Sequence, residues 1–267
     1  MIGNAVAGFL AGGVSGSQPP IASPFSWYDA ADLTTISTSG SSVTQWNDKG
    51  TNAANLTQAT GANQPTSGVT TLNGKNVITF DGADNLANST LSKFKFLSDG
   101  TVYIMGIVVK ASSSSNPGTY NMVFTNIRSA EGVTGRSMQF EDRVPSHARV
   151  YINNGATSVV SNTTSNNSWP SGGSTPIVYT ELTDPSNGTA ANRSYVYFNS
   201  GSAYNANGQT GSPSSSNGTY TFAVGATDQS VAGITGYIGE ILIYTGAAAT
   251  ESNRVIVRNY LQTKWGL

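Results

Sequence analysis

The chain has 267 residues, of which only 10% are charged, and its formal net charge is −1. This balance excludes the basic surface that a nucleic-acid-binding protein needs, so we expect no nucleic-acid partner. The chain has no cysteine and one histidine, His147. Disulfides, thiol catalysis and metal sites built from Cys or several His are therefore excluded, and a surface or turn role is expected for His147.

Residues 1–17 are apolar, uncharged and rich in glycine. The run is shorter than the ~20 residues that span a bilayer, and it lacks the positive start of a signal peptide, so we expect no membrane span. Because such a segment buries too little to offset its backbone entropy, we expect another subunit of a larger assembly to hold it. The alternative is that it packs on its own domain. The residues of this arm that would make the contact are Ile2, Val6, Phe9 and Leu10.

Prolines at positions 19, 20 and 24 indicate a linker, so we predict an arm over residues 1–20 and one domain over 21–267. Short runs rich in β-branched and aromatic residues follow, separated by clusters of Ser, Asn, Pro and Gly. They cover 101–110, 121–125, 149–153, 177–182, 194–199 and 220–225. The first is apolar on both faces and predicts a central strand. Many short strands with frequent turns predict a two-sheet sandwich.

The end of the chain predicts a long strand followed by a helix. Residues 237–244 are apolar on both faces, which is typical of a central strand covered on both sides. Thr250 is a plausible N-cap and Gly266 a plausible C-terminal stop. The apolar stripe of the helix is expected to contain Ile256, Val257, Tyr260 and Leu261, with Arg254 and Arg258 outside it. Trp265 is expected to pin the helix.

Several short motifs carry a resemblance to a known family. They are Trp27-Tyr-Asp-Ala30 with Asp32, Trp46-Asn-Asp-Lys49, Asn73-Gly-Lys75, Phe80-Asp-Gly82, Gly239-Glu-Ile241, Tyr260-Leu261 and Lys264-Trp-Gly266. In this order they resemble the laminin-G-like branch of the concanavalin A-like lectin/glucanase superfamily. The resemblance implies an all-β, two-sheet antiparallel jelly-roll sandwich with one C-terminal helix and, here, an extended N-terminal arm. Trp27 and Trp46 are then expected in the core.

The superfamily includes glucanases, but the sequence does not select a catalytic pair of carboxylates. The glucanase motif Glu-x-Asp-x-Glu is absent. Glu141 and Asp142 are adjacent, so on a strand they would point to opposite faces, and Glu181 and Asp184 are three residues apart. Carboxylates from different strands could still meet across a glycosidic bond. We expect a protein that is not an enzyme, with glycosidase activity as the alternative.

Calcium is a second candidate chemistry. Asp81 and Asp84 offer the oxygen ligands that Ca²⁺ prefers, although Asp-Gly-Ala-Asp is also an ordinary turn sequence. We expect that no cofactor is required and that Ca²⁺ could bind.

Carbohydrate recognition is the third candidate, because sugar rings pack on aromatic faces beside amide groups. Trp169, Tyr204 and Asn205 lie in polar loops and are the predicted ligand residues. Modules of the resembled family occur on phage structural proteins and bacterial surface proteins. Together with the missing catalytic chemistry and the apolar arm, the resemblance implies a non-enzymatic, lectin-like structural or decoration protein of a phage virion, displayed on the particle surface. It would contact other virion subunits through residues 1–20 and a host-surface glycan through its loops. The alternative is a carbohydrate-binding adhesin module on a bacterial extracellular surface.

Overall fold

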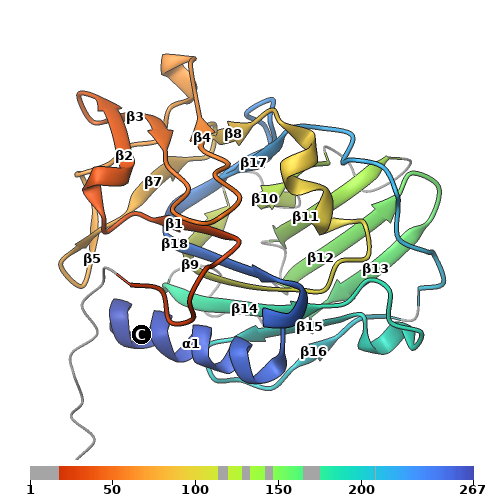
Figure 1. Ribbon diagram of the computed structural model, residues 1–267. Helices are drawn as coiled ribbons and strands as arrows, with labels where there is room; N and C mark the ends of the chain where they lie inside the picture. The colour runs from red at the N-terminus through yellow and green to blue at the C-terminus, as the bar shows by residue number, and fades with distance from the viewer. Residues whose placement is uncertain (1–17, 114–119, 128–132, 142–146, 165–174, 208) are drawn as a thin grey trace, which may run out of the picture.

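The computed structural model of the protein describes residues 18–113, 120–127, 133–141, 147–164, 175–207 and 209–267. Two antiparallel sheets lie face to face, and the helix α1 (Glu251–Trp265) lies on the outer face of one of them (Figure 1). The predicted all-β sandwich with a C-terminal helix is confirmed. Ile2, Val6, Phe9 and Leu10 of the predicted arm lie outside the described residues.

The first sheet is built around β18, the strand predicted at the end of the chain. Its strand order is β1-β18-β9-β14-β15-β16, and β7 also pairs with β18. β1 and β7 follow one another along one side of β18, and β9 lies along the other. Both predicted central strands are therefore confirmed. The strands are β1 (Ser26–Asp29), β7 (Ile78–Asp81), β9 (Tyr103–Ser113), β14 (Ile177–Thr183), β15 (Ser194–Phe198), β16 (Tyr204–Asn205) and β18 (Ile234–Thr245).

The second sheet has the order β13-β12-β11-β10-β17-β8-β4-β3-β2. Its strands are β2 (Ile36–Ser39), β3 (Ser42–Trp46), β4 (Leu56–Thr57), β8 (Leu86–Asn88), β10 (Tyr120–Thr125), β11 (Thr134–Glu141), β12 (His147–Asn154), β13 (Ser158–Thr163) and β17 (Phe222–Val224). A separate hairpin joins β5 (Thr71–Leu72) and β6 (Lys75–Asn76). Short 3-10 helices are η1 (Leu33–Thr35), η2 (Gly61–Asn63), η3 (Leu91–Leu97), η5 (Ala190–Asn192) and η6 (Gly246–Ala248).

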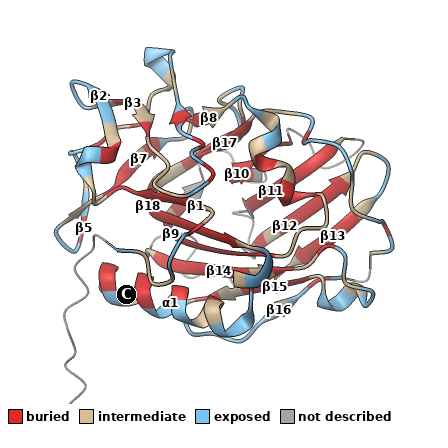
Figure 2. Ribbon diagram, in the orientation of Figure 1, coloured by how far each residue is buried: buried red, intermediate tan, exposed pale blue. Residues whose placement is uncertain are grey.

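The main core lies between the two sheets, where most strand residues are buried (Figure 2). Trp46 and Phe80 are fully enclosed there, and the rings of Phe94 and Phe222 stack with centroids 3.9 Å apart. A second apolar cluster lies between the first sheet and α1 and includes Trp27, Leu261 and Trp265. The expected burial of Trp27 and Trp46 is confirmed, and Trp265 packs α1 on the sheet as expected. Their burial explains why the motifs at the two ends of the domain specify its fold.

The ends of α1 lie where the sequence predicts them. The Thr250 hydroxyl accepts a hydrogen bond of 3.2 Å from the N–H of Asn253, and Gly266 ends the helix with φ of 67°. The stripe, however, is rotated from the predicted one. Ile256 is 44% exposed, whereas Arg254 is buried. The packed face is centred on Val257 and Leu261, which lie on β9, so Ile256 points outward and Arg254 lies on the sheet.

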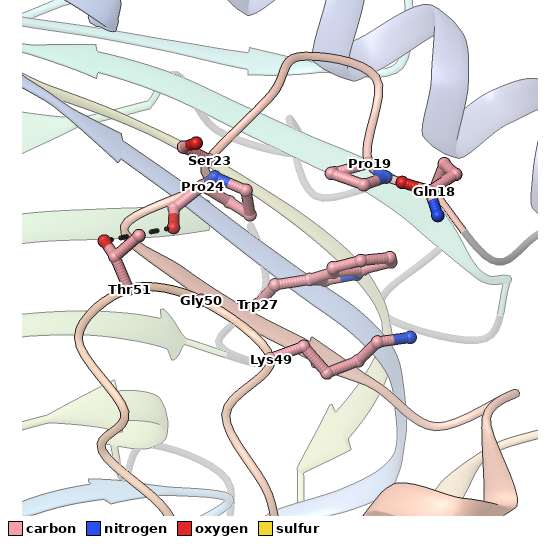
Figure 3. A pocket seen from close by; sticks show the side chains of 8 residues that line it. All are labelled: Gln18, Pro19, Ser23, Pro24, Trp27, Lys49, Gly50 and Thr51. Carbon is pink, nitrogen blue, oxygen red and sulfur yellow. Dashed lines mark hydrogen bonds between the residues drawn. The ribbon is translucent and has the colours of Figure 1, made fainter.

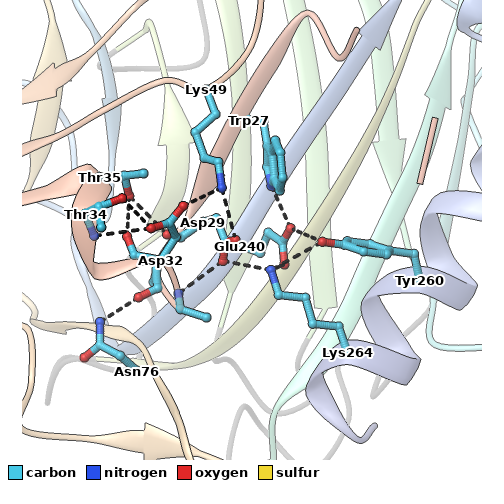
Figure 4. A network of polar contacts seen from close by, with 12 residues as sticks. Trp27, Asp29, Asp32, Thr34, Thr35, Lys49, Asn76, Glu240, Tyr260 and Lys264 are labelled. Carbon is cyan, nitrogen blue, oxygen red and sulfur yellow. Dashed lines mark hydrogen bonds and ion pairs between the residues drawn. The ribbon is translucent and has the colours of Figure 1, made fainter. Parts of the chain in front are cut away.

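A buried polar network closes the domain (Figure 4). Glu240 of β18 accepts hydrogen bonds from the indole N–H groups of Trp27, at 2.7 Å, and Trp265, at 2.8 Å. The Lys264 ammonium lies 2.7 Å from Glu240 and 2.8 Å from Asp29 of β1. The network therefore joins the first strand, the last strand and the helix. All of these residues belong to the motifs that carry the family resemblance. Their contacts show that these motifs have a structural role.

Candidate functional site

Beyond the edge of α1, the outer face of the first sheet carries two tyrosines. The helix packs on β9 and β14, and β15 and β16 continue the sheet beyond it (Figure 1). On β15, Val196 and Phe198 point into the core between the sheets. Successive side chains of a strand alternate between its faces, so Tyr195 and Tyr197 point outward, and both are half-buried. Two aromatic rings thus lie one after the other along the outer face of β15.

The register of the sheet places three further side chains beside these rings. Leu182 of β14 and Asn205 of β16 lie directly opposite Tyr195, one on each side. Thr180 of β14 lies directly opposite Tyr197. Directly opposed residues of an antiparallel pair point to the same face, with Cβ atoms about 4.5–5.5 Å apart. The exposed Asn205 amide is therefore a neighbour of the Tyr195 ring.

The first turn of α1 supplies a charged pair at the Tyr197 end. Arg254 donates from Nε to Glu251 Oε2 at 2.8 Å and from Nη2 to Oε1 at 2.6 Å. Its Nη1 donates to the Thr180 hydroxyl at 2.8 Å, and the guanidinium lies 3.5 Å from the centroid of the Tyr197 ring. Such a two-bonded pair is geometrically fixed. Arg254 consequently holds both the Glu251 carboxylate and the Tyr197 ring in position.

A hollow of about 340 Å³ lies here, lined by Leu182, Tyr195, Tyr197 and Glu251. The volume is within the range of small-ligand sites. Burial, followed by the Glu251 carboxylate, raises the pKa of the Tyr197 phenol above its ordinary value. The phenol therefore stays neutral near neutral pH and can both donate and accept a hydrogen bond. The Tyr195 hydroxyl donates to Asn192 at 2.8 Å. The hollow combines two aromatic faces with hydrogen-bonding groups.

Two other hollows have less suitable linings. One, of about 370 Å³, lies between the segment from Gln18 to Pro24 and the Trp27 and Lys49 side chains (Figure 3). Trp27 is only 4% exposed, and the Lys49 ammonium is 2.6 Å from Asp32. The Trp27 ring is thus buried and the Lys49 charge is already paired, so neither is available to a ligand in this hollow. The other, of about 250 Å³, is lined by Leu33, Ile36, Thr38, Gly40, Ser67 and Gly68 and has no aromatic ring.

The predicted ligand residues are separated by the structure. Asn205 lies beside Tyr195, as described above, whereas its neighbour Tyr204 is half-buried and packs its ring against Phe198, with centroids 5.7 Å apart. Tyr204 therefore faces the core side of the sheet. Trp169 lies outside the described residues.

Asp81 is the last residue of β7, and Asp84 lies in the turn that follows it toward β8. The Asp84 Oδ2 accepts the N–H of Asp81 at 3.0 Å, and the Asp81 Oδ1 accepts the N–H of Ala83 at 2.9 Å. Burial, and then the Asp81 charge, raises the pKa of Asp84 to about 7. Within the described ranges, no group of three or more Asp, Glu, His or Cys side chains could hold a metal ion. Two turn-bonded carboxylates supply few of the 6–8 oxygens that Ca²⁺ takes.

Glu181 and Asp184 do not face each other, and the side chains of Glu141 and Asp142 lie outside the described part of the chain. Glu181 is fully buried between the sheets, where it pairs with Arg136 and accepts from the Tyr179 hydroxyl at 2.5 Å. Asp184 accepts hydrogen bonds from Ser186 and Asn187 in a turn. Glu181 therefore has a structural role between the sheets and is not accessible to a ligand on the surface.

Sequence reasoning did not single out Tyr195, Tyr197 or Glu251. The alternation in Ser194-Tyr-Val-Tyr-Phe198 could have indicated that the tyrosines share a face. Glu251 is more than 50 residues away and comes next to them only through packing of α1 on the sheet. Among the described helices, none has the length and apolarity needed to cross a membrane.

The comparisons with solved structures define the class of the protein. An arabinofuranosidase complexed with arabinofuranosyl-α-1,2-xylobiose has a TM-score of 0.51 and 13% identity, over 83% of this chain and 51% of its own. The Trypanosoma rangeli sialidase in complex with sialic acid has a TM-score of 0.53 and 10% identity, over 92% and 34%. The binding domain of botulinum neurotoxin serotype D has a TM-score of 0.53 and 10% identity, over 90% and 51%.

At these identities the likeness shows the fold alone: the protein is a β-sandwich of the kind found in parts of glycosidases and in a toxin binding domain. The chain spans about half of the arabinofuranosidase and of the toxin domain, and about a third of the sialidase. No protein-family model and no curated protein sequence matches the chain. The narrower concanavalin A-like assignment stays a prediction.

Proposed function

We propose that this protein is a carbohydrate-binding module whose ligand lies on Tyr195 and Tyr197. The observation that carries the proposal is the pair of half-buried rings on one face of β15, next to the Glu251 carboxylate and the Asn205 amide. Sugar rings pack their C–H faces on aromatic rings while amides and carboxylates bond their hydroxyls. One structural neighbour, the arabinofuranosidase complexed with arabinofuranosyl-α-1,2-xylobiose, supports this choice.

A glycan array followed by calorimetry on the best ligand tests the proposal. Tyr195→Ala and Tyr197→Ala are each expected to weaken binding about tenfold, equivalent to ~1.4 kcal/mol. Tyr195→Phe keeps the ring and is expected to bind nearly as well as the wild type. Leu33→Ala, at a residue that is 60% exposed beside another hollow, is the control and is expected to change nothing. Unchanged binding by both alanine variants would exclude this face.

The module acts by recognition and not by catalysis in this proposal. Glu251 is fixed by Arg254, and the hollow is lined by no second carboxylate within the described part of the chain. Glycoside hydrolysis normally needs two. Incubation of the bound glycan with the protein should therefore release no shorter product. Hydrolysis that Glu251→Gln abolishes would establish an enzyme instead.

The setting that we propose is a phage virion, with the module on the particle surface and its glycan on the host. This part rests on the sequence resemblance and on the apolar, glycine-rich composition of residues 1–20. Deleting residues 1–17 should abolish incorporation into particles while glycan binding persists. Immunogold labelling distinguishes this setting from a bacterial adhesin, because the label would mark particles in the first case and cell surfaces in the second.

A further inference from the structure

Among the described residues, the hollow lined by Leu182, Tyr195, Tyr197 and Glu251 offers hydrogen-bond acceptors but no cation free of an ion pair. All three nitrogens of Arg254 are engaged, Nε and Nη2 by Glu251 and Nη1 by Thr180. The residues that line the hollow include one charged side chain, the Glu251 carboxylate, which is about half-exposed. A ligand carboxylate would therefore meet a like charge and find no donor of opposite charge among these described residues.

Nearby basic residues do not change this balance. Arg193, two residues before Tyr195, donates to the backbone carbonyls of Asn187, Val159 and Gly211. Arg258, one turn after Arg254, donates to its neighbour Asn259. Both guanidinium groups keep their positive charge, but these bonds hold them in place, and neither group lines the hollow. The hydroxyl groups of a neutral sugar, in contrast, can donate to Glu251 and to the Asn205 amide oxygen.

The arrangement along β15 also sets a minimum length for the ligand. Tyr195 and Tyr197 are two residues apart on one strand face, so their Cα atoms are about 6.6 Å apart. Arg254 covers one face of the Tyr197 ring, so the two platforms are the other face of Tyr197 and the Tyr195 ring. Each has its own polar neighbour, Glu251 for Tyr197 and Asn205 for Tyr195. A single sugar ring covers one platform, whereas two linked rings cover both. The second contact costs no further loss of translational freedom.

From these observations we infer that the site selects neutral oligosaccharides of at least two sugar units and excludes carboxylate-bearing glycans. This inference rests on the proposed function and adds the charge and length of the ligand. It also assigns Glu251 a second role: by occupying Arg254, it keeps a guanidinium from capturing acidic sugars.

An array that contains matched pairs tests both parts, for example lactose with 3′-sialyllactose and neutral chains of one, two and four units. The wild type is expected to bind the neutral partner of each pair at least tenfold more tightly, and chains of two or more units more tightly than single sugars. Tyr195→Ala should abolish the advantage of length while Tyr197 still holds one unit. Preferential binding of sialylated or uronate-bearing glycans, or equal binding of single sugars and chains, would overturn the inference.

Glu251→Ala provides the sharper test because it leaves Arg254 without its carboxylate partner. This variant is expected to gain binding to the acidic member of each pair, whereas the control Leu33→Ala keeps the neutral preference. Far-ultraviolet circular dichroism confirms that each variant is folded. If Glu251→Ala is folded and still rejects acidic glycans, the assigned role is wrong. If no glycan on the array binds the wild type, the proposed function itself fails, which is a different outcome.

Discussion

Lys264 and Glu240 form an ion pair of 2.7 Å in which both side chains are almost completely buried. The pair links the last turn of α1 to the central strand β18, and the same ammonium reaches Asp29 of β1 at 2.8 Å. One cation thus lies between two carboxylates inside the protein. Removing one member of such a group leaves uncompensated charge in a place where water cannot solvate it.

Lys264→Met is therefore expected to destabilise the protein by about 3–5 kcal/mol, measured by urea unfolding. Adding Glu240→Gln should restore part of this loss because Glu240 is the carboxylate left without a cation, whereas Asp29 keeps Lys49 at 3.7 Å. Arg258→Met, on the same helix, is the control and is expected to change stability by less than about 0.5 kcal/mol. If Lys264→Met and Arg258→Met destabilise the protein equally, the burial of Lys264 does not explain its contribution to stability.

Gly106 allows α1 to lie close to β9. A Cβ placed there would be 2.6 Å from Cγ1 of Val257 and 2.8 Å from Cδ1 of Leu261. Gly106→Ala is expected to cost about 1–3 kcal/mol, because the two side chains must move in a packed layer. Gly61→Ala is the matched control, since nothing lies within 4 Å of its added Cβ. Thermal unfolding of both variants checks the prediction, which a stabilising Gly106→Ala would contradict.

Asp84 makes stability depend on pH. Its pKa is about 7 in the folded protein and 3.8 ordinarily, so between these values the folded state binds more protons than the unfolded state. Stability is therefore highest below pH 3.8 as far as this group is concerned, and it declines as pH rises to about 7.

Asp84→Asn should remove this decline, so the variant is expected to exceed the wild type in stability at pH 8. Asp81→Asn should reduce the decline, because it removes the second cause of the raised pKa. Urea unfolding from pH 4 to pH 8 measures both effects. A wild-type slope that persists in Asp84→Asn must come from another group.

Excess EDTA is expected to leave the melting temperature unchanged. The Asp81 and Asp84 carboxylates already accept backbone N–H groups in their turn. An ion that binds only the folded state would raise the melting temperature, and the rise would grow with the logarithm of the ion concentration above its Kd. A fall in EDTA that added Ca²⁺ reverses would establish a structural ion, and Asp81→Asn would then locate it.

The fold was largely predictable because the central strands and the helix have clear patterns of apolar and capping residues. The two-sided apolar runs of β9 and β18 and the caps of α1 depend on local chemistry, and they were identified correctly. The burial of Arg254 and the exposure of Ile256 were not predicted. A long cationic side chain can be buried on a sheet that offers it a hydrogen-bond acceptor and an aromatic ring, here Thr180 and Tyr197. The spacing of apolar residues along a helix contains no information about such partners on the sheet.

The candidate site was only partly predictable. Asn205 was selected for its polar loop, but the partner that matters, Tyr195, comes from strand pairing. The alternation on β15 is ambiguous by composition, since both faces carry apolar or aromatic residues. Only the burial of Val196 and Phe198 decides which face is outside, and this burial depends on the second sheet. The position of Glu251 depends in addition on how α1 docks.

The strand order has a mechanical consequence for a protein that holds a ligand under load. From β15 the sheet runs through β14, β9 and β18 to β1, each step being an antiparallel ladder. The Tyr244 hydroxyl of β18 also donates to the carbonyl of Ile21, at 2.9 Å. Tension between a glycan on β15 and an attachment before residue 21 would thus be transmitted across one continuous sheet and shared among its backbone hydrogen bonds.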